Sequence, residues 1–434
     1  MIIAPQPLRG KFPRLLEAPK LVHVQPLVPE RAVEALVKCD TCLGKRYYWG
    51  MGEFQIKRVK VENFKSLADF EMRDIPMFAC LIGINGCGKT TFLQFVDFVK
   101  ALMVGDVKGW LDLHDLNAGE LLTFGNERKK NVIEMEIDAV IDGTPASWAA
   151  TFNVRELRCT AERLEEGGVA YHFNAGRLTI SEQGKRLQTV DYGPSSYTGS
   201  IFSFRKTKFG QFIRETSLLG VLDPHAIAQP SRTAKSGRLT HVEGNGKNLS
   251  AFVAGLSSET QMDLFRQIHE FYSPLDEFKV KRQQFGWKSL LMRELGNAVF
   301  SATNLSYGTL RLFVLLSQQY ADDKVVLCDE VENGLNQELF EKFVAKLRNY
   351  GDPPKQVFVS THSGLFLNYL TDEQARESVF FLYKGETGRT RARRFFDIPE
   401  ISEKLNVLGP GEAMGDTDLM QLSGRLAAED GKIA

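Results

Sequence analysis

The sequence predicts an α/β protein with a mixed, mainly parallel sheet, an antiparallel β meander and a helical insertion. A glycine-rich loop joins the apolar stretch 77–82 to a helical pattern at 91–103. In the C-terminal third, buried strands and amphipathic helices alternate, which is typical of a parallel sheet covered by helices. Between these parts, the stretch 133–141 alternates apolar and polar residues and ends at Asp142-Gly143, a hairpin signal.

The composition is that of an ordinary globular protein. The 434 residues are 43% hydrophobic and 25% charged, which allows two or three lobes and a substantial core. No apolar run approaches the roughly 18 residues of a membrane span and no export signal is visible, so we expect no membrane partner. Six scattered cysteines indicate a reducing compartment, and we expect a cytoplasmic protein. A formal net charge of zero argues against a chain coated in nucleic acid but leaves room for a local basic groove.

The stretch 83–90 reads GINGCGKT and fits the phosphate-binding pattern G-x-x-x-x-G-K-[ST]. Its glycines allow successive N–H groups to point at a polyphosphate, and the N-terminus of the following helix adds positive potential. We expect Lys89 to reach the β- and γ-phosphates and the Thr90 hydroxyl to bind Mg²⁺. The sequence therefore predicts a bound nucleoside triphosphate, with ATP and Mg²⁺ as cofactors. The expected nucleotide contacts are Asn85, Gly86, Cys87, Gly88, Lys89, Thr90 and Thr91.

A second stretch supplies the acidic groups that this chemistry needs. Four apolar residues, Val325–Cys328, predict a buried strand that ends in Asp329 and Glu330. Beside the phosphate loop, Asp329 can hold Mg²⁺ directly or through water. Glu330 can orient and deprotonate the attacking water, and general-base help of this kind is worth about 10²–10⁴-fold in rate. An apolar run that ends in two acids is common, so its meaning depends on its neighbours.

Further stretches resemble those of ABC-type ATPases. Asn304–Gly308 is similar to their L-S-x-G signature and precedes the acidic strand, as that family requires. His362 follows another predicted strand and resembles the family's switch histidine, and 332–335 resembles its D-loop. The resemblance implies a P-loop NTPase of ABC-ATPase type, in which Lys89, Glu330 and His362 are the catalytic residues and His362 contacts the γ-phosphate.

The resemblance also implies a homodimer that assembles head to tail on ATP binding. In the family, the signature of one subunit serves the ATP bound by the other, so two ATP molecules are buried between the subunits. Ser306 and Gly308 then bind nucleotide, because a hydroxyl, a glycine backbone and a helix N-terminus offer donors to a γ-phosphate. By the same resemblance, Lys65 touches the nucleotide.

Two stretches indicate the subgroup. VENFKSL at 61–67 and DEVENGLN at 329–336 resemble the corresponding segments of RecF-, SMC- and OLD-like ATPases, whereas transporter ATPases tend to read D-E-P-T. Leu408–Glu412 is similar to the tail of small bacterial AAA-type ATPases. The resemblance covers 54–412 and implies an ATPase of DNA repair or anti-phage defence. OLD proteins often carry a TOPRIM nuclease domain, and we expect the residues after His362 to be too few for one.

Four segments are expected along the chain. Residues 1–50 are a proline-rich extension that contains Cys39–Cys42, half of a zinc-knuckle pattern. Residues 51–230 form an N-terminal ATPase lobe with the phosphate loop and the meander. Residues 231–300 are a flexible loop followed by a mostly helical insertion. Residues 301–434 form a C-terminal ATPase lobe with the signature, the acidic strand and the histidine.

Three functions compete. We favour a dimeric ATPase that acts on DNA over an ATP-driven scaffold that controls a separate toxic effector protein, and both over a transporter subunit. The preferred DNA contact is Arg205–Lys208, because Phe202, Phe204 and Phe209 interleave its basic residues. Other basic clusters lie at 128–130, 279–282 and 389–394.

Overall fold

The computed structural model describes residues 54–124, 131–193, 197–220, 222–233, 239–296 and 299–433. The expected extension at 1–50, its cysteine pair and the basic cluster at 128–130 lie outside the described residues. Among the helices that are described, none combines the length and the apolar character needed to cross a membrane.

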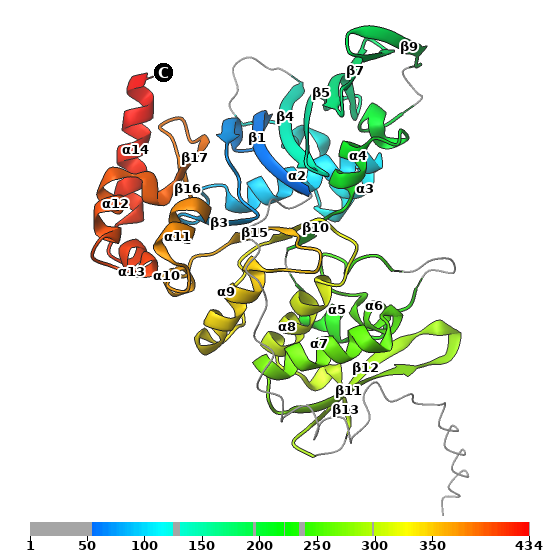
Figure 1. Ribbon diagram of the computed structural model, residues 1–434, viewed down its shortest axis with the longest axis vertical. Helices are drawn as coiled ribbons and strands as arrows, with labels where there is room; N and C mark the ends of the chain where they lie inside the picture. Colours follow the sequence, from blue (N-terminus) through cyan, green and yellow to red (C-terminus); the bar gives the residue numbers. More distant parts are fainter. Residues whose placement is uncertain are drawn as a thin grey trace, which may run out of the picture.

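A six-stranded sheet forms the centre of the molecule (Figure 1). In spatial order its strands are β10 Thr216–Leu219, β14 Val325–Cys328, β15 Gln356–Ser360, β3 Phe78–Ile82, β16 Val379–Lys384 and β17 Thr390–Arg394. The first five strands are parallel and β17 is antiparallel, so the predicted mainly parallel sheet is confirmed. Because parallel strands end at one edge, Gly83, Asp329 and Thr361 follow neighbouring strands on the same side of the sheet.

An eight-stranded antiparallel sheet confirms the predicted meander. In spatial order its strands are β2 Leu67–Met72, β1 Phe54–Phe64, β4 Val132–Ile141, β5 Thr144–Asn153, β6 Arg158–Glu166, β7 Val169–Asn174, β8 Arg177–Glu182 and β9 Lys185–Asp191. Every second residue of β4 is buried, as its alternating sequence predicts. Asp142 and Gly143 join β4 to β5 with φ values of 49° and 71°, so the predicted hairpin is also confirmed.

Helix α2, Lys89–Val104, lies between the two sheets. The ring of Phe92 on this helix is 5.5 Å from the ring of Phe70 on β2 and 5.8 Å from that of Phe358 on β15. Its buried apolar residues recur with the helical period that the sequence predicts. The phosphate loop at its start is therefore fixed by packing against both sheets.

A lower lobe in Figure 1 contains α5 Pro224–Ala228, α6 Leu249–Gly255, α7 Ser258–Phe271 and α8 Tyr307–Gln318. Against these helices packs a three-stranded antiparallel sheet of β11 Leu275–Arg282, β12 Lys288–Glu294 and β13 Phe300–Ser301. The prediction of a mostly helical stretch from 248 to 300 is therefore wrong after α7. The side chains of Phe278 and Val280 are buried while those of Lys279 and Lys281 are not, which is the period of a half-buried strand.

Further helices cover the remaining faces. Figure 1 shows α10 to α14 gathered beside β16 and β17 at one end of the central sheet. Their bounds, with those of the other helices, are α3 Val107–Leu113, α4 Lys208–Arg214, α9 Phe340–Arg348, α10 Gly364–Leu367, α11 Asp372–Ser378, α12 Pro399–Leu405, α13 Pro410–Gly415 and α14 Leu419–Ile433. The amphipathic helices predicted for the C-terminal third include α9, which a single 3₁₀ turn at Gln337–Leu339 precedes.

Candidate nucleotide-binding site

The loop between β3 and α2 depends on its glycines. Gly83, Gly86 and Gly88 have φ values of 144°, 76° and 113°, in the region that side chains disfavour. A Cβ at Gly83 would also collide with the carbonyl oxygen of Leu382, and one at Gly88 with the side chain of Thr390. Nothing lies within 4 Å of the Cβ position of Gly86. The loop is thus closed on the side of β16 and β17 and open on the other.

On the open side lies a cavity of about 330 Å³. It brings together residues that follow β3, β14 and β15, which are far apart in the sequence but end at one edge of the sheet. Its lining contains most of the predicted site residues: Asn85, Gly86, Gly88, Lys89, Thr90, Thr91, Asp329, Glu330 and His362. The predicted Cys87, Ser306 and Gly308 are not among them.

The ammonium group of Lys89 is held inside the loop. Lys89 is buried, and its Nζ donates hydrogen bonds to the carbonyl oxygens of Gly83 at 2.9 Å and Ile84 at 3.2 Å. Burial lowers the pKa of Lys89, although nearby Asp329 opposes this effect. These carbonyls fix the amine at the wall of the cavity. An anion bound there would be a stronger hydrogen-bond acceptor for the amine than these neutral carbonyls.

A hydroxyl and two carboxylates meet at the bottom of the cavity. Thr90 Oγ1 donates a hydrogen bond of 2.8 Å to Asp329 Oδ2, and Ser360 Oγ donates to Asp329 Oδ1. Ser360 Oγ also accepts a 2.8 Å hydrogen bond from the backbone N–H of Glu330. One serine on β15 therefore sets both acidic residues at the end of β14. The Thr90 hydroxyl and the Asp329 carboxylate are oxygen ligands of the kind that Mg²⁺ binds.

Glu330 is held in a strained backbone conformation. Its φ of 46° lies in the left-handed region, which costs a residue with a side chain roughly 1–3 kcal/mol. Its carbonyl oxygen accepts a 2.7 Å hydrogen bond from the guanidinium of Arg311 on α8. The same guanidinium donates to the carbonyl of Asp329 at 3.1 Å and to Tyr307 Oη on its own helix. Asn333 Nδ2 donates to the Glu330 carboxylate, which is exposed to the cavity.

His362 lies across the cavity from the phosphate loop. Its backbone N–H donates a 2.6 Å hydrogen bond to Glu332 Oε1, which connects the end of β15 to the segment after Glu330. Partial burial, and after it the charge of Lys89, lowers the pKa of His362. The imidazole is therefore mainly neutral near pH 7, and one of its nitrogens carries a proton that can be donated.

Two predicted nucleotide contacts lie elsewhere. Cys87 is buried in the core, and its backbone N–H donates to the carbonyl of Ile84 within the loop, so neither group faces the cavity. Burial raises the pKa of the Cys87 thiol, which favours its neutral form. Lys65 donates a 2.9 Å hydrogen bond to Gln94 Oε1 on the side of α2 and does not line the cavity.

The signature segment does not line the cavity of its own chain. Ser306 caps α8, and its Oγ accepts a 3.2 Å hydrogen bond from the backbone N–H of Thr309. A Cβ at Gly308 would collide with the carbonyl oxygen of Gly334, so the signature and the segment 332–335 are packed against each other. Within one chain, the described structure does not bring Ser306 or Gly308 to the phosphate loop.

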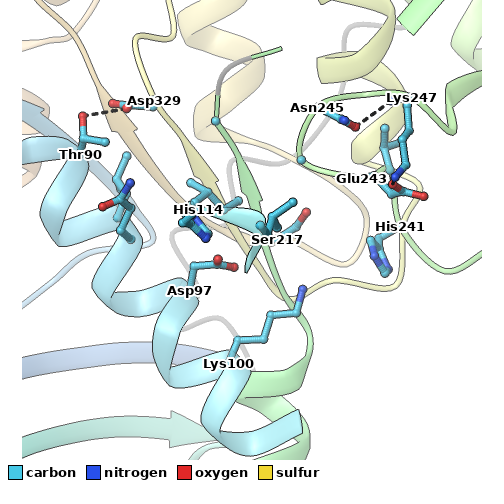
Figure 2. Close-up of a pocket in the computed structure, with 17 residues that line it drawn as sticks. Thr90, Asp97, Lys100, His114, Ser217, His241, Glu243, Asn245, Lys247 and Asp329 are labelled. Atoms are coloured by element: carbon cyan, nitrogen blue, oxygen red, sulfur yellow. Dashed lines mark hydrogen bonds and ion pairs between the residues drawn. The ribbon is translucent and has the colours of Figure 1, made fainter. Parts of the chain in front are cut away.

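A second cavity, of about 450 Å³, adjoins the first. Thr90 and Asp329 line both cavities, so their hydrogen bond forms part of the wall between them. Figure 2 shows α2 on one side of this second cavity and the loop before α6 on the other. Its labelled polar residues include Asp97, Lys100, His114, Ser217, His241, Glu243, Asn245 and Lys247. The helix that follows the phosphate loop is therefore separated from the lower lobe by a gap that reaches Asp329.

The preferred DNA contact at Arg205–Lys208 is wrong for two of its three aromatic residues. Phe202 and Phe209 are fully buried in the core beside the meander, so no base could stack on them, whereas Phe204 is 50% exposed. Lys208 forms an ion pair with Asp142 at 2.6 Å. Aromatic and basic residues alternate here because a turn and a short helix bury their aromatic face and leave their basic residues at the surface.

Three of the four arginines at 389–394 also bind within the chain. Arg391 forms an ion pair with Asp69 at 2.9 Å, and Arg393 forms one with Asp430. Arg394 donates to the backbone carbonyl of Asp74 at 2.6 Å. These arginines attach β17 to β2 and α14, so they serve the fold.

A comparison with protein families identifies the domain. The family model described as "AAA domain, putative AbiEii toxin, Type IV TA system" matches residues 78–368. The chain belongs to this AAA family. The match starts at β3 and ends beyond His362, so it contains every predicted site residue except Lys65. The predicted relationship to ABC-type ATPases of the OLD- and SMC-like group is confirmed by this match and by the relative described next.

The chain is also similar to a nuclease. It is 24% identical over 336 residues to the OLD nuclease of Thermus scotoductus, an alignment that covers 72% of this chain and 59% of that protein. The chain thus spans less than two thirds of the length of this relative.

Solved structures of SMC heads also match. An SMC head bound to the C-winged helix domain of ScpA has 13% identity and a TM-score of 0.46, with 78% of this chain and 96% of that chain covered. The SMC head domain from Thermotoga maritima has 12% identity and a TM-score of 0.42, with 78% and 98% covered.

Arg311 and Ser360 are absent from the sequence prediction, and Asn333 lies in the predicted stretch 332–335 without a role assigned to it. Arg311 has a recognisable signal, since it is the one charged residue in the apolar run 310–316 and must find acceptors when that helix is buried. Ser360 and Asn333 have no comparable signal. Serine at a strand end and asparagine in a turn are common, and only the folded geometry shows that they hold Asp329 and Glu330.

Proposed function

We propose that this AAA domain hydrolyses ATP with Mg²⁺ in the cavity beside the phosphate loop. The observation that carries the proposal is the 2.8 Å hydrogen bond between Thr90 Oγ1 and Asp329 Oδ2, with Glu330 next to it in the same cavity. The open backbone at Gly86 and the buried amine of Lys89 suit a polyphosphate. The hydroxyl and carboxylate oxygens suit the metal.

Each residue has one task in this mechanism. Bound Mg·ATP supplies the reacting phosphoryl group and a metal that neutralises its charge. Lys89 exchanges the carbonyls of Gly83 and Ile84 for phosphate oxygens, which are stronger acceptors. Glu330 accepts a proton from the attacking water, and neutral His362 donates a hydrogen bond to the γ-phosphate.

We further propose that two chains pair head to tail. Two observations support this pairing. Ser306 and Gly308 do not line the cavity of their own chain, and the N-terminus of α8, where they lie, has donors that suit a phosphate. A second subunit can supply this segment. Hydrolysis then requires two chains, each of which completes the site of the other.

We place this activity in DNA repair or anti-phage defence, in the cytoplasm. The similarity to an OLD nuclease supports a role on DNA. A second candidate is an ATP-driven scaffold for a separate toxic effector protein, and the family description, which names a toxin–antitoxin system, favours it. Hydrolysis that is stimulated by DNA at low salt supports the first role, whereas hydrolysis that ignores DNA supports the second.

Steady-state hydrolysis by Glu330→Gln tests the core of the proposal. We expect ATP binding, measured with a fluorescent ATP analogue, to be retained and turnover to fall about 100-fold, because the amide cannot accept the proton. Glu338→Gln is the matched control, since Glu338 is exposed and lies outside the cavity. Near-normal turnover in Glu330→Gln would remove Glu330 from the role of base, and no turnover in the unaltered chain would refute the proposed activity.

A further inference from the structure

The hairpin of β11 and β12 ends in residues that are unfavourable for the fold. In Figure 1 this yellow-green hairpin projects from the lower lobe beyond α7. At its tip Phe285 is 87% exposed, and its backbone lies in the left-handed region with φ 58° and ψ 23°. Bulky residues rarely adopt this conformation, and a glycine would adopt it without strain. An exposed phenylalanine in a strained turn does not stabilise the hairpin, which indicates a role other than folding.

The charges at the tip also oppose the fold. Arg282 and Lys288 lie directly opposite each other in the strand pairing, and like charges in this position are destabilising. Burial, and after it the charge of Arg282, lowers the pKa of Lys288. Within the described part of the chain, no ion pair reaches Lys281, Arg282 or Lys288. The tip therefore concentrates positive charge that no described side chain neutralises.

A second aromatic residue and a fourth cation complete this surface. Trp287 is partly exposed, and the guanidinium of Arg232 lies 5.2 Å from the centre of its ring. Two backbone hydrogen bonds between Ser231 and Lys288, of 2.9 and 2.8 Å, hold Arg232 beside the hairpin. We call this surface, formed by Arg232, Lys281, Arg282, Phe285, Trp287 and Lys288, the hairpin tip.

We propose that the hairpin tip binds single-stranded DNA. Its aromatic rings would stack on bases, and its cations would contact the phosphates on either side. Proteins that bind single strands combine these two features, because every base has a face that can stack and every nucleotide carries a charge. Base-paired DNA hides those faces inside the duplex, so it would use the cations alone. An acidic protein would likewise use the cations and leave Phe285 without a partner.

The hairpin tip is connected to the nucleotide site by packing. The ring of Phe278 on β11 is 5.6 Å from the ring of Phe313 on α8 in an edge-to-face contact. Helix α8 starts at the signature and carries Arg311, which binds the carbonyls of Asp329 and Glu330. The inference thus deepens the proposed role on DNA and rests on it for any effect on hydrolysis, but binding itself needs no ATP.

Fluorescence anisotropy with a labelled 20-nucleotide oligo-dT, without ATP, tests the inference on the full chain. We expect Phe285→Gly to weaken binding about tenfold or more, because one stacked base is lost. The same variant should melt at a higher temperature, since glycine relieves the strained turn. A side chain with only a structural role would give the opposite change in melting temperature. Tyr369→Ala is the control, because Tyr369 is a partly exposed aromatic residue outside both the hairpin tip and the Arg205–Lys208 segment.

The cations are tested by salt dependence. For single strands, log K falls with log salt by about 0.7 per phosphate contact, so Arg282→Gln should reduce the slope by about that amount. It should also stabilise the hairpin by removing the charge opposite Lys288. Arg186→Gln, an exposed arginine on the strand β9, should change neither property.

The outcomes separate this inference from the proposed function. Oligo-dT affinity that is unchanged in Phe285→Gly overturns the inference. Competition by poly-glutamate as effective as by oligo-dT, with no dependence on Phe285, also overturns it and indicates an acidic protein partner. Binding that is lost in Phe285→Gly supports the hairpin tip even if the unaltered chain hydrolyses no ATP, in which case only the proposed function fails.

Discussion

The guanidinium of Arg311 donates a 2.7 Å hydrogen bond to the backbone carbonyl of Glu330, and a second one of 3.1 Å to that of Asp329. Arg311 is only 3% exposed, so these bonds compensate part of the cost of burying its charge. Because Arg311 belongs to α8, it attaches the helix that begins at the signature to both acidic residues of the site. The position of α8 is therefore linked by hydrogen bonds to the strained backbone of Glu330.

The first prediction concerns Arg311→Met. This variant keeps the apolar stem but leaves two partly buried carbonyls without a donor, which costs up to about 1–3 kcal/mol each. We expect a lower melting temperature and a kcat reduced about tenfold or more, with little change in KM, because Glu330 is no longer held in place. Arg214→Met is the control, since Arg214 also donates to two backbone carbonyls but lies away from the cavity. It should lower stability and leave kcat unchanged. A similar loss of kcat in both variants would show that Arg311 acts only through the stability of the fold and does not position Glu330.

The second prediction concerns Ser360→Ala. Its hydroxyl donates to the Asp329 carboxylate and accepts from the Glu330 N–H, so its loss frees both groups. Groups that orient metal ligands typically change metal affinity 10–100-fold. We expect the Mg²⁺ concentration for half-maximal hydrolysis to rise about tenfold. Ser378→Ala removes another buried serine, which donates only to a helix carbonyl, and should leave the Mg²⁺ dependence unchanged. An unaltered Mg²⁺ requirement in Ser360→Ala would separate Ser360 from the metal site.

The sequence predicts those parts of the site that are built from short, continuous stretches of residues. The phosphate loop and the acidic strand end are local patterns, and their meeting follows from parallel strands that share an edge. The contact of Arg311 with Glu330 depends instead on the direction in which α8 packs behind β14, which no local pattern specifies. The same limit applies to Phe202, because aromatic and basic residues alternate both on nucleic-acid surfaces and on helices with one buried face.

The region before the signature shows a different limit. Residues 278–281 of β11 alternate between buried and less buried side chains, but the stretch is short and follows the helix α7. The sequence prediction therefore extends the helical insertion into residues that form a strand. The partner strand β12 and its pairing are what decide the conformation. The features of the hairpin tip, a left-handed Phe285 and the opposed charges of Arg282 and Lys288, exist only once this pairing is formed.

The third prediction tests the head-to-tail dimer with two inactive variants. Ser306→Arg should bind ATP in its own phosphate loop but fail to complete the site of its partner. Glu330→Gln should complete its partner's site but fail to hydrolyse in its own. A mixed dimer of the two contains one intact site, because Glu330 of one chain then faces Ser306 of the other. We expect mixing to restore hydrolysis that neither variant has alone. If both variants bind ATP and their mixture stays inactive, the signature does not act in trans.

The fourth prediction concerns the pH dependence of stability. Glu162 on β6 is buried, and its carboxylate accepts hydrogen bonds from Ser200 Oγ at 2.6 Å, from the backbone N–H of Ile201 and from Trp148 Nε1 at 3.1 Å. Burial outweighs these donors and raises the pKa of Glu162 to about 7. In the unfolded chain the pKa of a glutamate is about 4.3, so between these values the folded state binds the proton more tightly.

This difference fixes the sign of the effect. The stability that protonated Glu162 contributes is fully present below about pH 4.3 and is lost as the pH rises through about 7, since ionisation then favours unfolding. Between pH 5.5 and pH 8 the loss is about 2 kcal/mol, which urea unfolding measures as a difference between the unaltered chain and Glu162→Gln. Glu165→Gln, on the exposed face of the same strand, should keep the full pH dependence. If the unaltered chain and Glu162→Gln change in parallel over this range, Glu162 is ionised throughout and its three donors outweigh its burial.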